Sequence, residues 1–128
     1  MISICEALEN ATKIGGKAGL NCIAGLIDTN DVDQIVAKSF ATGPLAGVPV
    51  LVKDNIDVEG FPTTAGSLAL EDNLAMNDAK VIRNLRRNGA VIIGKTNLTE
   101  FANYVSPLMP CEEKAIAKDD KQWCYLLT

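Results

Sequence analysis

The sequence contains no histidine in its 128 residues. This absence excludes the Ser-His and Cys-His nucleophile pairs and the histidine-bearing metal motifs. If the chain takes part in catalysis, its general base is therefore a lysine, an aspartate or a glutamate.

Positive charge is also scarce, since 12 lysines and arginines face 16 acidic residues and the formal net charge is −4. The one basic cluster consists of Arg83, Arg86 and Arg87, which is too small for a nucleic-acid or anionic-membrane surface. No apolar run approaches membrane-spanning length, and the first residues lack the basic start and apolar segment of a secretory signal. We therefore expect a soluble, cytoplasmic protein with small neutral partners, binding neither nucleic acid nor membranes.

Cysteines are few and scattered, at positions 5, 22, 111 and 124, with no C-x-x-C pair. This spacing does not suggest a disulfide framework, so reduced thiols are expected. Without histidine or paired cysteines, a zinc site is not expected either. The sequence predicts no metal and no cofactor.

What the chain does have is a high apolar content, 48% of its residues, which is enough for the core of one domain. Capping patterns and periodicity predict four helices, beginning near Ser3, Asp31, Asn77 or Asp78, and Asn97. Apolar runs predict two strands at residues 48–52 and 90–93, each covered on both faces. A strand, a helix and a second strand in succession predict parallel pairing and an α/β fold.

The segment GAVIIGKT, residues 89–96, satisfies the phosphate-loop pattern G-x-x-x-x-G-K-[ST] letter for letter. A phosphate loop follows a strand, however, whereas here a predicted helix precedes Gly89 and the middle residues are typical of a strand. We therefore favour a helix cap, a buried strand and a turn, and keep nucleotide binding through residues 89–96 as a minor alternative.

Two other patterns also have ordinary explanations. DTNDVD, residues 28–33, resembles the start of a calcium loop, but Asp33 replaces the required glycine and Ser39 the closing glutamate. A turn and a helix cap are the better interpretation. RNLRR, residues 83–87, is expected to be the solvent-facing side of its helix.

Lys53 ends the apolar run GVPVLVK, so it should lie at the carboxyl end of a strand. Ligand sites of α/β sheets gather there. Lysines are mostly exposed, so position alone favours a solvated side chain. A lysine acts as a base only in its neutral form, and pairing with Asp54 or Asp57 would oppose that form.

Two segments together resemble the amino-terminal part of the amidase signature family, which hydrolyses the carbon–nitrogen bonds of amides. They are GPLAGVPVLVKDNIDVEGFPTTAGS and DAKVIRNLRRNGAVIIGKTNLTEFAN, and the likeness runs from about Asn21 to Val105. NYVSPLMP, residues 103–110, is closer to the peptide-amidase-like branch than to the tRNA-dependent amidotransferase branch. The resemblance implies a partial amidase-signature α/β fold, with a parallel or mixed sheet and flanking helices.

The resemblance also implies a role for Lys53, because the lysine of the family's V-K-D-N segment is catalytic. It acts with a bridging serine in a cis peptide and a nucleophilic serine. Both serines lie in a downstream stretch of the form G-G-S-S-x-G-S, which this sequence does not contain. Ser67 and Ser106 match neither position.

We therefore expect residues 1–110 to be the amino-terminal part of an amidase domain and residues 111–128 to be a poorly integrated tail. A changed reading frame near Pro110 would explain the abrupt loss of resemblance. The chain by itself is expected to be inactive toward the family's small-molecule or peptide amides. The alternative is a noncatalytic interaction module that uses exposed apolar surface to self-associate or to bind another polypeptide.

Overall fold

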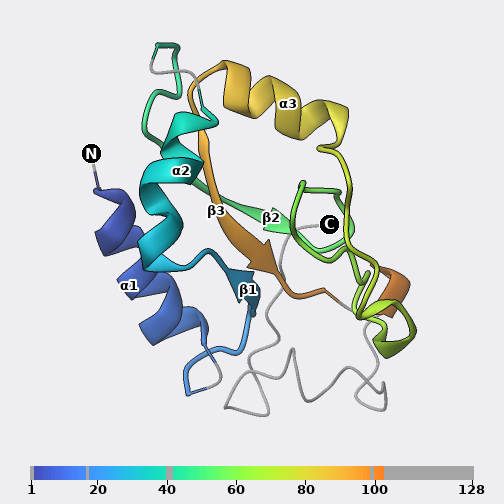
Figure 1. Ribbon diagram of the computed structural model, residues 1–128. Coiled ribbons are helices and arrows are strands. Elements are labelled where there is room, and N and C mark those ends of the chain that lie inside the picture. Colours follow the sequence, from blue (N-terminus) through green and yellow to red (C-terminus); the bar gives the residue numbers. More distant parts are fainter. Residues whose placement is uncertain (1, 17, 40–41, 99, 103–128) are drawn as a thin grey trace.

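The computed structural model describes residues 2–16, 18–39, 42–98 and 100–102, and its centre is a sheet of three strands (Figure 1). The strands are β1 (Ile23–Leu26), β2 (Pro49–Lys53) and β3 (Val91–Thr96), in the order β1-β3-β2. β2 is parallel to β3, and β1 is antiparallel to it. The predicted parallel pairing and mixed α/β sheet are confirmed, while β1 was not predicted. The proposed tail, residues 111–128, lies outside the described residues.

Helices flank the sheet on both sides, with α1 (Ile4–Gly15) and α2 (Val32–Ala37) on one side and α3 (Lys80–Arg87) on the other (Figure 1). Three short 3-10 turns complete the described elements: η1 (Thr29–Asp31), η2 (Leu68–Leu70) and η3 (Glu100–Ala102).

The strand β3 lies in the middle and all six of its residues are buried. Its side chains divide between two apolar clusters. Val91 and Ile93 pack with Leu8 of α1, whereas Ile92 packs with Ile82 of α3. The expectation that this run is covered on both faces is therefore confirmed, and residues 89–96 form a helix cap, a strand and a turn.

β2 differs from this expectation because it is the last strand of the described sheet. Val52 is buried, but Leu51 is 37% exposed. The prediction that β2 is covered on both faces is wrong for the described part of the chain, since side chains cover mainly the face toward α3. Pro49 is the first residue of β2, where its missing N–H costs no hydrogen bond inside the ladder.

An irregularity at Gly94 changes the register of the sheet. Val50 pairs with Ile92 and Leu51 pairs with Gly94, so Ile93 is an extra residue in β3. Gly94 also lies close against β1, because a Cβ atom at this position would be 2.3 Å from the carbonyl oxygen of Gly25. Only glycine allows this approach without a shift of the backbone.

The helix starts were predicted with mixed success. Ser3 caps α1 by accepting a hydrogen bond from the Glu6 amide. The Asp28 side chain caps η1 in the same way, by accepting from the Asn30 amide. α3 begins at Lys80, after the predicted start at Asn77 or Asp78, and the Asp78 carboxylate accepts from the Glu59 amide instead of capping the helix. The predicted helix from Asn97 is wrong, since the described residues there form only η3. The side-chain amide of Asn97 donates to the Asn21 carbonyl.

Candidate functional site

Lys53 lies at the carboxyl end of β2, as the sequence predicted. It is the register partner of Thr96, the last residue of β3, so both strands end together. The following residue continues the contact, because the Asp54 amide donates to the Thr96 carbonyl at 3.0 Å. Lys53 is partly buried, and its backbone pairs with β3 on one side.

Directly beside Lys53, a buried ion pair joins Asp54 to Lys95. The Nζ atom of Lys95 lies 3.0 Å from Oδ1 of Asp54. The exposed fractions are 3% for Asp54 and 1% for Lys95. The hydroxyl of Thr64 donates to the other carboxylate oxygen. The carboxylate that could have paired with Lys53 is thus bound by Lys95.

Lys95 also holds the loop that follows β2. Its Nζ atom donates to the Pro62 carbonyl at 3.2 Å and lies 3.5 Å from Oγ1 of Thr63. One ammonium group therefore contacts the start of the loop, at Asp54, and its middle, at residues 62–63. These contacts also exclude a phosphate loop here, because residues 91–96 form a strand and their lysine is bound within the protein.

The loop between β2 and α3 turns sharply after Thr64. Ala65 and Gly66 have positive φ angles of 49° and 75°, and the Ala65 amide donates to the Asp54 carbonyl. The Ala65 carbonyl accepts from the Phe101 amide at 2.7 Å. Segments that follow β2 and β3 therefore meet beside Lys53. Ser67, which follows the turn, is buried.

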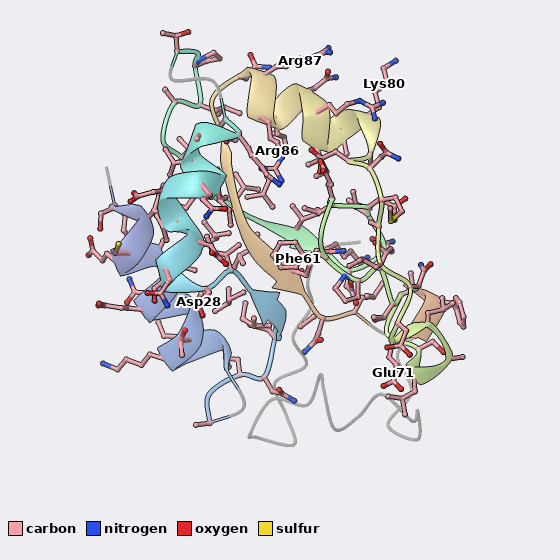
Figure 2. The ribbon with its side chains drawn as sticks, viewed as in Figure 1. Asp28, Phe61, Glu71, Lys80, Arg86 and Arg87 are labelled. Atoms are coloured by element: carbon pink, nitrogen blue, oxygen red, sulfur yellow. The ribbon has the colours of Figure 1, made fainter. Side chains whose placement is uncertain are left out.

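A second ion pair, largely buried, fastens the same loop to α3. Nε of Arg86 lies 2.9 Å from Oδ2 of Asp78, whose Oδ1 accepts from the Glu59 amide. Arg86 is 9% exposed and points beneath α3, whereas Arg87 and Lys80 point away from the core (Figure 2). The prediction that the whole RNLRR segment faces solvent is therefore wrong at Arg86.

The arrangement places the amine-bearing residue Lys53 at a strand end, next to a buried polar cluster of Asp54, Thr64 and Lys95 that is satisfied within itself. Asp57 is exposed, and in the described part of the chain no ion pair involves Lys53. Ser106 lies outside the described residues. The sequence analysis did not predict that Asp54, Thr64 and Lys95 bind one another. A signal was available, because a lysine inside a continuous buried strand requires a buried partner.

Within the described residues, no group of three or more His, Cys, Asp or Glu side chains could hold a metal ion. Nor is any helix in that part of the chain long and apolar enough to span a membrane.

Comparison with known proteins gives a consistent result. The family model "Amidase" matches residues 12–111. A glutamyl-tRNA(Gln) amidotransferase subunit from Methanococcoides burtonii is 46% identical over 94 residues, covering 73% of this chain and 19% of that protein. The corresponding subunit from Lachnoclostridium phytofermentans is 53% identical over 97 residues, covering 76% of this chain and 16% of that protein.

Solved structures agree with these matches. The same glutamyl-tRNA(Gln) amidotransferase subunit from Thermotoga maritima superposes with a TM-score of 0.66 and 29% identity, covering 85% of this chain and 21% of that one. The native peptide amidase of Stenotrophomonas maltophilia gives a TM-score of 0.63 and 32% identity, covering 82% of this chain and 22% of that one. Because both kinds of protein match, the assignment to the peptide-amidase-like branch stays a prediction.

The chain thus spans about a fifth of the length of the relatives it matches. The matched region includes both strands that end at Lys53 and Thr96, together with the loop and helix between them. The mixed sheet, the flanking helices and the sequence match all agree. The chain belongs to the amidase signature family.

Proposed function

We propose that this chain is the lysine-bearing part of an amidase and that Lys53 is its general base. The observation that carries the proposal is the position of Lys53. It ends β2 beside the end of β3, within the segment that matches the family model. Ligand sites of α/β sheets lie at such strand ends.

In the proposed reaction, the neutral amine of Lys53 takes the proton of a bridging serine hydroxyl. The bridging serine in turn takes the proton of a nucleophilic serine, whose oxygen attacks the amide carbonyl carbon. The leaving amine receives a proton back through the bridging serine as the carbon–nitrogen bond breaks. The family's two serines lie in a glycine- and serine-rich stretch that this sequence does not contain, so further polypeptide must supply them.

We expect the purified 128-residue chain to hydrolyse no amide, and Lys53→Ala to be equally inactive. A lysine without a nucleophile and an oxyanion hole lacks the largest stabilising contribution to acyl transfer. The measurement is release of ammonia or amine from peptide amides and simple aromatic amides. Turnover by the chain that disappears in Lys53→Ala would show that the serines of this sequence suffice, and would contradict the proposed incompleteness.

The alternative of a noncatalytic interaction module is favoured by one specific observation, the exposure of several apolar side chains along one loop. Leu68, Leu74 and Met76 belong to the loop between β2 and α3, and Met76 is 76% exposed. Phe101, also exposed, is held against this loop by its hydrogen bond to the Ala65 carbonyl. Exposed apolar patches of this kind are typical of interaction surfaces.

If these side chains bind a second copy of the chain, the chain should self-associate at high concentration. Size-exclusion chromatography with light scattering should then give a mass above 13.6 kDa, and Met76→Asp should return it to the monomer. The exposed Lys80→Asp is the matched control and should leave the mass unchanged. A monomer at all concentrations that binds no apolar dye would contradict the interaction hypothesis.

A further inference from the structure

Lys53 and Asp54 are neighbours in the chain, but the Asp54 carboxylate is bound by Lys95 on one face of the sheet and Lys53 belongs to the other. Lys53 pairs in register with Thr96, and Val52 pairs with Lys95. Side chains of register partners lie on the same face of a sheet. Lys95 therefore lies on the Val52 face, toward α3, and binds the Asp54 carboxylate there. Lys53 is on the opposite face.

The extra residue in β3 is what places Lys95 on the face toward α3. In a regular strand, alternation would place Lys95 on the same face as Val91 and Ile93, which pack toward α1. The extra residue at Ile93 shifts the alternation by one position. Lys95 thereby reaches Asp54 and the carbonyl of Pro62 instead of the α1 side.

We propose that Lys95 is a positioning residue for Lys53, acting by withholding the Asp54 carboxylate from its amine. This inference rests on the proposed role of Lys53 as a base. A carboxylate beside an amine favours the charged form, which cannot accept a proton. Thr64 assists, because its hydroxyl and its amide both donate to the Asp54 carboxylate. The two donors and Lys95 together fix the carboxylate on the face away from Lys53.

The test measures the nucleophilicity of the Lys53 amine in the 128-residue chain, without any need for turnover. The chain is treated with limiting N-hydroxysuccinimide acetate, and acetylation of Lys53 is quantified by peptide mass spectrometry relative to the exposed Lys80. Only the neutral amine reacts. Lys95→Met should slow the labelling of Lys53 by about threefold, as expected for a new ion pair near the surface. Asp54→Asn/Lys95→Met should restore the wild-type rate, because no carboxylate is left to pair.

A purely structural role predicts a different pattern. Loosening the site would make Lys53 label at the same rate or faster in Lys95→Met, and the double variant would not reverse a slowing. Either result overturns the proposal. Circular dichroism checks the fold of each variant. If Lys95→Met does not fold, Asp54→Asn decides: labelling less than threefold faster than wild type supports the proposal, and labelling at least threefold faster overturns it.

If Asp54→Asn does not fold either, nuclear Overhauser effects in the wild-type chain decide. Contacts from the ε protons of Lys95 to the β protons of Asp54 support the proposal, and contacts from those of Lys53 in their place overturn it. None of these readouts depends on amide hydrolysis. A failure of the positioning role is therefore distinct from a failure of Lys53 as the catalytic base.

Discussion

Replacing Lys95 with methionine should lower the free energy of unfolding by about 3–5 kcal/mol, the usual cost of removing one partner of a buried ion pair. The Asp54 carboxylate, 3% exposed in the wild type, would lose its 3.0 Å partner and could reach Lys53 only by leaving this buried position. The Pro62 carbonyl and the Thr63 hydroxyl would lose the same donor. Urea unfolding followed by circular dichroism measures the change, with the loop between β2 and α3 expected to loosen first in hydrogen exchange.

The cause can be separated from a general loss of packing by a double-mutant cycle. Asp54→Asn/Lys95→Met removes both charges, so it should be more stable than Lys95→Met alone. Lys80→Met is the matched control, because Lys80 is exposed on α3 and its loss should change stability by less than about 0.5 kcal/mol. The ion pair would not be important to the fold if Lys95→Met behaved like this control.

Much of the architecture could be predicted from local sequence signals. The run before Lys53 and the run after Gly89 are apolar and β-branched, and a strongly amphipathic helix separates them. These features fix two parallel strands and place Lys53 at a strand end. The cap at Ser3 was equally predictable, because its side chain and the Glu6 amide have capping spacing.

The remaining features depend on contacts between distant residues. β1 contains Gly25 and is only four residues long, so its apolar pattern is weak, and it forms because β3 offers it a partner. Leu51 is exposed because β2 is the last strand of the described sheet. The sequence of a strand does not say whether that strand will be in the middle of a sheet or at its edge. The pairing of Lys95 with Asp54 depends on the extra residue at Ile93, since regular alternation predicts the opposite face.

The role of Lys53 is best measured in an enzyme that supplies the missing residues. We would replace the matching segment of the Stenotrophomonas maltophilia peptide amidase with residues 12–111 of this chain, the region that the family model covers. If the chimera hydrolyses peptide amides, Lys53→Ala should lower kcat by about a thousandfold, which is within the usual contribution of a general base. KM should change little, because Lys53 acts on the proton of the bridging serine and not on the bound amide.

Two controls give this result its meaning. Lys80→Ala changes an exposed lysine on α3 and should keep the activity of the chimera. Lys53→Arg keeps the positive charge but provides no neutral form near neutral pH, so it should be as inactive as Lys53→Ala. A structural role for the charge predicts instead that Lys53→Arg retains activity. That outcome, or a loss of less than about tenfold in Lys53→Ala, would be too small for a general base and would contradict the assignment.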